Sequence, residues 1–245
     1  MKMIKYVLLI CLLSIQMVWA KPPTYVLVHG AWGGSWSFKQ TALALQEAGA
    51  EVYRVNLTGL GERVHLANPQ VNLSTHVKDV LNTILFDQLE DVILVGHSYG
   101  GMVITAVADR IPERIQRLIY LDAFLPEHGE SIDFFVSNGP NAALMHSKDQ
   151  VYVEPFWEKD NNSFPRDVPH PLASMKEKVS LSNPKRKQIP STYILTYEKD
   201  IEKDDFYYFY QRAKLYQWKT LTMLGDHNPQ RSQTKELVSV LLKEK

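Results

Sequence analysis

The sequence has few of the features that mark several classes of protein. Only one of its 245 residues is a cysteine, which excludes a disulfide framework and a cysteine-based metal site. Its 27 basic residues are balanced by 27 acidic ones, so it lacks the strongly basic character that nucleic-acid binding requires. With 12 glycines and 13 prolines it is neither collagen-like nor of low complexity. Its 45% of hydrophobic residues suffices for the core of one large domain.

The chain also lacks an apolar run of the ~20 residues that a membrane-spanning helix needs. Residues 1–5 carry two lysines, residues 6–18 are almost entirely apolar, and Ala20 offers a small residue for cleavage. This order is typical of a secretory signal peptide, with an uncleaved N-terminal anchor as the alternative. We therefore expect cleavage after Ala20 and a secreted or periplasmic protein. The mature chain, residues 21–245, would contain no cysteine, and its 25 basic and 27 acidic residues would give a net charge of −2.

Short apolar runs alternate with stretches of helical spacing along the mature chain. Strands are expected at 25–29, 51–57, 91–96, 118–121, 192–196 and 221–224, and helices at 36–48, from Ser74 to about 85, 100–110, 204–215 and 234–242. Such alternation produces a parallel sheet with helices on both faces. The sequence therefore predicts an α/β fold with a mostly parallel sheet.

The alternation stops between about residues 127 and 189. This stretch is rich in proline and charge, has no clear period, and is too long for an ordinary connection. Its aromatic residues argue against a disordered segment. We expect a cap inserted over a site in the domain formed by residues 21–245.

The pattern G-x-S-x-G occurs at residues 96–100, between an expected strand and an expected helix. A sharp strand-to-helix turn with flanking glycines exposes the serine at the carboxyl edge of the sheet. N–H groups at the start of the following helix are then available to a developing oxyanion. The sequence therefore predicts Ser98 as a nucleophile, with a chance occurrence of the pattern in a loop as the alternative.

A glycine-rich loop at residues 29–34 directly follows the first expected strand. An oxyanion hole in this architecture takes one N–H group from the residue after the nucleophile, here Tyr99, and another from such a loop. Ala31 is the best candidate for the second donor. We expect His29 to bind backbone groups of the loop rather than to transfer protons.

Of the eight histidines, only His227 lies in the loop directly after the last expected strand. A hydroxyl nucleophile needs a general base that titrates near neutral pH, usually histidine. With His227 as the base, the chain has the order Ser, acid, His of one hydrolase architecture. Asn228 and Pro229 indicate a helix cap and a first helical residue, so we expect Asn228 to be structural.

The acid that orients His227 is expected after the penultimate strand, 192–196. Glu198 and Asp200 both lie in that loop. The distance from the strand end favours Glu198, and the more common residue type favours Asp200. Asp122, after the strand at 118–121, is a third candidate, with a loop or helix cap as its alternative role. The chain order and spacing favour Glu198.

Together these motifs resemble the α/β-hydrolase fold, in particular the branch of plant methylesterases of the salicylate-binding type, hydroxynitrile lyases and related bacterial esterases. The matching segments are VLVHGAWGGSW at 26–36, LTGLGER at 57–63, VILVGHSYGGMV at 92–103, YLDAFLP at 120–126 and GDHNP at 225–229. The resemblance implies a triad of Ser98, an acid and His227, an oxyanion hole at Ala31 and Tyr99, a small cap over an apolar pocket, and no metal or cofactor. The family usually has Asp two residues after the threonine that ends the strand, where this chain has Glu198.

Two departures from the hydroxynitrile lyases favour hydrolysis. Those enzymes carry a lysine directly after the catalytic histidine, where this chain has Asn228. They also have a threonine-bearing insertion before the HGAW segment, for which residues 28–30 leave no room. Dehalogenase and epoxide-hydrolase relatives use Asp as the nucleophile, so Ser98 argues against both of those reactions.

We therefore expect a serine esterase that acts on a small carboxylic ester through an acyl-enzyme intermediate, without a cofactor. A receptor on the same fold that binds a ligand with little turnover is the alternative. The expected partner is a small-molecule ester and not a nucleic acid, the membrane is contacted only through the signal segment before cleavage, and a homodimer is left open. The preferred acyl or alcohol group does not follow from the sequence, because the cap that shapes the pocket is its least informative segment.

Overall fold

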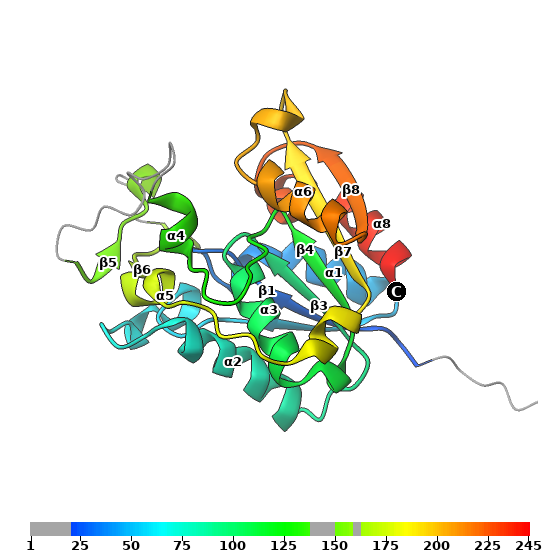
Figure 1. The fold of residues 1–245 in the computed structure, drawn as a ribbon, viewed down its shortest axis with the longest axis horizontal. Helices are drawn as coiled ribbons and strands as arrows, with labels where there is room; N and C mark the ends of the chain where they lie inside the picture. The colour runs from blue at the N-terminus through cyan, green and yellow to red at the C-terminus, as the bar shows by residue number, and fades with distance from the viewer. Residues whose placement is uncertain (1–20, 138–149, 159–162) are drawn as a thin grey trace, which may run out of the picture.

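A computed structural model of the chain describes residues 21–137, 150–158 and 163–245. The expected signal segment at 1–20 and two parts of the expected cap, 138–149 and 159–162, lie outside the described residues. Figure 1 shows a central sheet with helices around it and a group of short elements at the end opposite to the C-terminus. In the described part of the chain, no helix has the length and apolar character that crossing a membrane requires.

Six parallel strands form the sheet in the order β2-β1-β3-β4-β7-β8. Their bounds are β1 Thr24–Val28, β2 Glu51–Val55, β3 Val92–His97, β4 Ile115–Leu121, β7 Ser191–Tyr197 and β8 Lys219–Leu224. A separate antiparallel ribbon pairs β5 Tyr152–Val153 with β6 His170–Pro171. The predicted α/β fold with a mostly parallel sheet is confirmed.

The helices of the described residues connect and cover these strands. The α-helices are α1 Lys39–Glu47, α2 Leu73–Phe86, α3 Gly100–Arg110, α4 Ile132–Val136, α5 Leu172–Lys176, α6 Tyr207–Leu215, α7 Pro229–Ser232 and α8 Thr234–Leu241. Short 3₁₀ helices are η1 Ser35–Phe38, η2 Gly61–Leu66, η3 Pro112–Arg114, η5 Phe156–Glu158, η6 Pro184–Gln188, η7 Ile201–Lys203 and η8 Leu242–Glu244.

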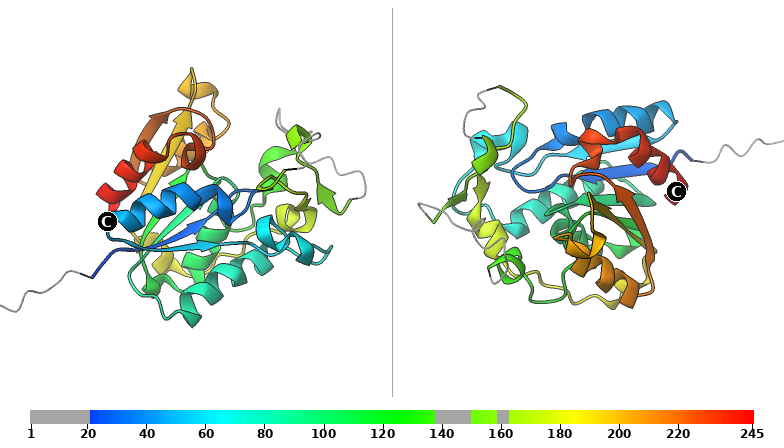
Figure 2. Two further views of the ribbon diagram at one scale, coloured as in Figure 1. Left: turned by 180° about the vertical axis from the view of Figure 1, so that it is seen from behind. Right: turned by 90° about the horizontal axis from the view of Figure 1, so that it is seen from above.

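The alternation of side chains along the central strands builds one hydrophobic core on each face of the sheet. Val26 and Val28 of β1 belong to the core that includes residues of α2, α3 and α6. Tyr25 and Leu27 belong to the core that includes residues of α1 and α8. Figure 2 shows the sheet between these helices from two further directions. Because both faces of the sheet are covered at its centre, the central strands β1 and β3 are nearly continuous apolar runs, which made them predictable.

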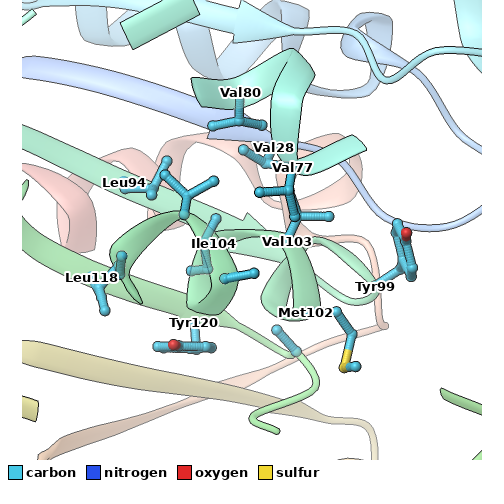
Figure 3. Close-up of a cluster of buried hydrophobic side chains, with 14 of the residues drawn as sticks. Val28, Val77, Val80, Leu94, Tyr99, Met102, Val103, Ile104, Leu118 and Tyr120 are labelled. Atoms are coloured by element: carbon cyan, nitrogen blue, oxygen red, sulfur yellow. The ribbon is translucent and has the colours of Figure 1, made fainter. Parts of the chain in front are cut away.

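Figure 3 shows how α2 and α3 close on one face of the sheet. Val80 of α2 and Val103 of α3 are fully buried in the same core as Val28 and Leu94 of the sheet. Burial of such a side chain contributes ~1.5–3 kcal/mol. This packing fixes the start of α3, and with it the position of the turn that precedes α3.

The segment between β4 and β7 leaves the sheet and forms α4, β5, β6 and α5, grouped together in Figure 1. Ser74, which we expected to cap α2, instead connects this helix to the segment between β4 and β7. The helix is capped two residues earlier by Asn72, whose side chain accepts the N–H of Thr75 at 3.0 Å. Ser74 instead donates its N–H and hydroxyl to Glu177, just after α5, at 2.8 and 2.5 Å.

Candidate active site

Ser98 lies in a strained turn between β3 and α3. Its φ of 53° is in the left-handed region that residues other than glycine rarely adopt. Its N–H donates to the carbonyl of Leu121 at 3.2 Å, and its carbonyl accepts the N–H groups of Gly101 and Phe124 at 3.0 and 3.1 Å. These bonds hold the turn at the carboxyl edge of the sheet, where Ser98 lines a cavity.

Glycine is required at two positions around this turn. A Cβ atom on Gly96 would lie 2.7 Å from the carbonyl oxygen of Gly100, and one on Gly101 would lie 2.0 Å from the carbonyl oxygen of Phe124. Both obstructing atoms belong to the backbone and cannot move aside as a side chain can. The G-x-S-x-G-G sequence thus permits the close approach of strand, helix and following loop.

His227 lies in the loop after β8, in contact with the loop after β4. Its Nδ1 is 2.6 Å from Oδ2 of Asp122. Asp122 is 1% exposed, and its Oδ1 accepts the N–H of Thr196 at 3.0 Å. The carboxylate therefore fixes the proton on Nδ1 of His227 and leaves Nε2 free to accept another. The imidazole lines the same cavity as Ser98.

The structure contradicts the expectation that Glu198 or Asp200 accompanies His227. Both side chains are exposed, and Asp200 pairs with Lys203 at 3.1 Å. Strand β7 ends one residue before Glu198, which leaves the sheet toward solvent. Asp122, the third candidate, takes the position beside His227 and preserves the expected chain order of serine, acid and histidine.

The sequence contained a signal that favours Asp122. It follows a strand directly and is flanked by Leu121 and Ala123, whereas residues 198–205 are all charged except Ile201. A carboxylate among apolar neighbours is costly to bury unless it has a partner, so such an acid indicates a buried pair. The φ of 44° at Asp122, which turns the chain behind β4, leaves no mark in the sequence pattern.

Three carboxylates determine the charge state of His227. Burial lowers its pKa, but the hydrogen bond and charge of Asp122 and the charges of Asp204 and Asp205 outweigh burial, so its pKa lies above 6.5. Burial and the neighbouring Asp122 raise the pKa of Asp204 to about 6. The ring of Phe206 stacks on His227 with centroids 4.8 Å apart. The surroundings thus stabilise the imidazolium that a general base forms.

Ala31 and Tyr99 line the cavity together with Ser98. Within the described residues, neither of their backbone N–H groups donates a hydrogen bond to another protein group. The next residue, Trp32, has a φ of 61° and donates its own N–H to Nδ1 of His170 at 3.2 Å. The residues predicted to form the oxyanion hole thus line the cavity of Ser98 and have N–H groups available to an oxyanion.

Two of the other histidines, both neutral, form hydrogen bonds with backbone groups of the loops around this site. His29 donates from Nδ1 to the carbonyl of Gly30 and accepts the N–H of Leu57 on Nε2, at 2.8 and 3.1 Å. Burial lowers its pKa to about 4, so it binds backbone groups as expected. His97 donates from Nε2 to the carbonyl of His227 at 2.7 Å, and burial lowers its pKa well below 6.5. His146 lies outside the described residues.

The cavity beside Ser98 has a volume of about 450 Å³ and a mostly aromatic wall. Besides the imidazole of His227, its rings are those of Trp32, Tyr99, Phe124, Phe135, Trp157, Phe206, Tyr208 and Phe209. Asp204 and Asp205 also line it, and among its described lining residues none is lysine or arginine. These dimensions suit a small organic molecule with an apolar or aromatic part.

A second cavity, of about 330 Å³, shares Ser98 and His227 with the first. Its wall includes the charged residues Glu158, Asp167 and Arg231. The serine and histidine thus lie where two cavities of different character meet, so two parts of one bound molecule would have separate environments.

Comparisons with known proteins identify the family to which this fold belongs. The matching family model is described as "Alpha/beta hydrolase family" and covers residues 25–240. A carbendazim hydrolyzing esterase of Nocardioides sp. (strain SG-4G) is 58% identical over 108 residues, which cover 44% of this chain and 45% of that protein. Putative methylesterase 15, chloroplastic, of Arabidopsis thaliana is 30% identical over 212 residues, 74% of this chain and 47% of that protein. The chain spans about half the length of these curated relatives.

Solved structures share the same fold. An extracellular α/β-hydrolase from a Paenibacillus species, described as a structural and functional homologue of tobacco salicylic acid binding protein 2, matches with a TM-score of 0.75 and 25% identity. The match covers 91% of this chain and 98% of that one. An Arabidopsis methylesterase matches with a TM-score of 0.68 and 24% identity, with the same two coverages.

Proposed function

Since the chain belongs to the α/β-hydrolase family, in its methylesterase-like branch, we propose that it is a serine esterase that hydrolyses small carboxylic esters. The observation that carries this proposal is the bond of 2.6 Å between His227 and buried Asp122, in the cavity that Ser98 lines from its strained turn. The names of the relatives, which are esterases and methylesterases, support the same reaction.

The proposed first step forms the acyl-enzyme. Oγ of Ser98 attacks the ester carbonyl carbon while Nε2 of His227 takes the hydroxyl proton. Asp122 accepts the Nδ1–H bond and stabilises the imidazolium. The N–H groups of Ala31 and Tyr99 bind the negative oxygen of the tetrahedral intermediate. When the carbon–oxygen bond breaks, the alcohol leaves with the proton of His227.

The second step releases the acid. His227 takes a proton from a water molecule, whose oxygen attacks the acyl carbon bound to Ser98. The second tetrahedral intermediate uses the same two N–H groups, and its collapse returns the proton from His227 to Ser98. Every proton is accounted for by one imidazole, so the cycle requires no further group.

Covalent labelling with a fluorophosphonate probe tests the proposal directly. Wild-type protein is expected to react at Ser98 and to hydrolyse p-nitrophenyl esters, whereas Ser98→Ala is expected to do neither. Ser137→Ala, which removes an exposed serine after α4, is the matched control and should keep both properties. Wild-type protein that takes up no probe and turns over no ester would instead indicate a receptor on this fold.

The alternative reaction, that of a hydroxynitrile lyase, is disfavoured because this chain has no lysine directly after His227. Asn228 stands directly after His227, and its side-chain oxygen accepts a hydrogen bond from Gln230 at 3.3 Å. Its N–H donates to Asp226 at 2.7 Å at the start of α7. Asn228 is engaged in the structure of the loop and offers no positive charge to a leaving cyanide.

We also propose that residues 1–20 act as a cleaved export signal, on the composition of that segment. N-terminal sequencing of the protein exported by a bacterial host is expected to begin at Lys21. An intact Met1 on the exported protein would contradict the proposed cleavage.

A further inference from the structure

We infer that the cap segment completes the oxyanion hole, with His170 as a positioning residue that holds the loop of Ala31. The inference rests on the proposed function, because it concerns the N–H groups that would bind the oxyanion. Trp32, which follows Ala31, has a φ of 61°, a rare conformation for a residue with a large side chain. Such a conformation persists only where surrounding contacts enforce it.

The contacts that enforce it come from the cap. The N–H of Trp32 donates to Nδ1 of His170 at 3.2 Å, and its carbonyl accepts the N–H of Val168 at 2.8 Å. Its indole Nε1 donates to the carbonyl of Val153 at 2.8 Å. All three partners lie more than a hundred residues after Trp32 in the sequence. The peptide that links Ala31 to Trp32 is therefore held from the cap side.

The tautomer of His170 makes it an acceptor for Trp32. The hydroxyl of Ser174 donates to the carbonyl of Pro171 at 2.8 Å, so it must accept the bond of 2.7 Å from Nε2 of His170. With its proton on Nε2, the neutral ring leaves Nδ1 to accept the N–H of Trp32. His170 is fully buried, and a neutral ring agrees with a pKa that burial lowers well below 6.5.

The same imidazole also packs against the second candidate donor of the oxyanion hole. The centroid of its ring is 4.9 Å from that of Tyr99 and 5.9 Å from that of His76. His76 donates from Nε2 to the carbonyl of Thr58 at 2.9 Å, so its Nδ1 accepts the hydroxyl proton of Tyr99 at 2.8 Å. One cap residue thus contacts Tyr99 and the neighbour of Ala31.

Replacement of His170 by leucine and by asparagine tests the inference. His170→Leu removes the acceptor for Trp32, whereas His170→Asn keeps a short side chain with an acceptor atom. We expect kcat of His170→Leu to fall by about 10- to 100-fold, below the effect of deleting an oxyanion donor outright, with KM little changed. His170→Asn should recover most of the lost kcat.

A boronic acid inhibitor, which forms a tetrahedral adduct with the serine, separates positioning from general stability. Its affinity should fall in parallel with kcat/KM across the His170 variants, because both depend on the oxyanion hole. The matched control is His128→Leu, since Nδ1 of His128 also accepts a backbone N–H, that of Leu181 at 3.1 Å, but outside the lining of either cavity. That variant should keep the kcat and the inhibitor affinity of the wild type.

Ser174→Ala provides a second arm in case His170→Leu does not fold. It leaves the ring of His170 in place but removes the acceptor that fixes its tautomer, and should lower kcat in the same direction. Unchanged kcat in folded His170→Leu or in Ser174→Ala, or an asparagine variant no better than leucine, would overturn the inference. A wild-type protein without esterase activity would contradict the proposed function instead. The failure of the inference about His170 can therefore be distinguished from the failure of the proposed function.

Discussion

At the scale of single residues, the site depends on one carboxylate that stands among apolar neighbours. Asp122→Asn is expected to lower kcat by about 10³- to 10⁴-fold, because an amide cannot hold the proton on Nδ1 of His227. The kcat of Glu198→Gln and of Asp200→Asn should stay within about twofold of the wild type, since both side chains are exposed. Steady-state kinetics on one ester measures all three. If Glu198→Gln lost as much kcat as Asp122→Asn, Glu198 would also be needed as an acid for His227.

The pH dependence of kcat/KM reports the charges around His227. The base acts only when neutral, and its pKa lies above 6.5, so activity should fall as pH decreases through a midpoint above 6.5. The charged groups that raise this midpoint are Asp122, Asp204 and Asp205. Asp204→Asn removes one of the negative charges that raise the pKa of His227, and should therefore move the midpoint to lower pH. A midpoint identical in both proteins would show that Asp204 does not act on His227.

The charges in the aromatic cavity also predict which esters it rejects. Asp204 and Asp205 line it, without a lysine or arginine among the described lining residues. The methyl ester of 4-carboxybenzoate should therefore have a kcat/KM about tenfold or more below that of methyl 4-tert-butylbenzoate. Replacement of both aspartates by asparagine should decrease the difference in kcat/KM between the two esters. Equal rates for the two esters with the wild type would mean that the aryl group binds elsewhere.

At the scale of elements, the contact between α3 and the loop after β4 leaves no room for a side chain. Gly101→Ala would place a Cβ atom 2.0 Å from the carbonyl of Phe124, so backbone must move. We expect the variant to lose at least ~1–3 kcal/mol in free energy of unfolding. Denaturant titration measures the loss. Gly33→Ala, where the nearest atom is 3.7 Å away, is the control and should unfold like the wild type.

At the scale of the whole molecule, buried neutral histidines link stability to pH. Burial lowers the pKa of His29 and of His76 to about 4, whereas the unfolded chain takes up their protons near 6.5. Their contribution to stability is therefore complete above 6.5 and decreases as pH falls toward 4. Between pH 7 and 5 each should cost roughly 2 kcal/mol. His97 and His170, whose pKa values are also lowered, add to this loss.

Four groups act in the opposite direction. The pKa values of His227, Asp204, Asp79 and Asp167 are raised in the folded state, so protonation of these groups favours folding as pH decreases. Four lowered histidines outweigh them, and chemical denaturation at pH 7 and at pH 5 should give a smaller free energy of unfolding at pH 5. A free energy that is constant or larger at pH 5 would refute this balance.

The sequence predicted the parts of the molecule that depend on local pattern. Strands buried on both faces are apolar runs, and Ser98 lies in a motif whose glycines are needed for close packing. Asp122, the partner of His227, was ranked below Glu198 and Asp200 because β4 and β7 are neighbours in the sheet, so loops after either strand can supply a carboxylate. The choice between them depends on the backbone at Asp122, which turns with a φ of 44°. The broken periodicity distinguished the segment between β4 and β7 from the rest of the chain, whereas its contacts with Trp32 have no sequence signature.

Those contacts have a consequence for the order in which the protein assembles. The loop after β1 is held by Val153, Val168 and His170, which follow it by more than a hundred residues. Contacts of such large sequence separation form late, because closure of a long loop costs entropy before the contacts compensate for it. In refolding from denaturant, the recovery of ester hydrolysis should therefore lag behind the recovery of helical circular dichroism. The loop after β1 would thus reach its final conformation only after the elements around it have formed.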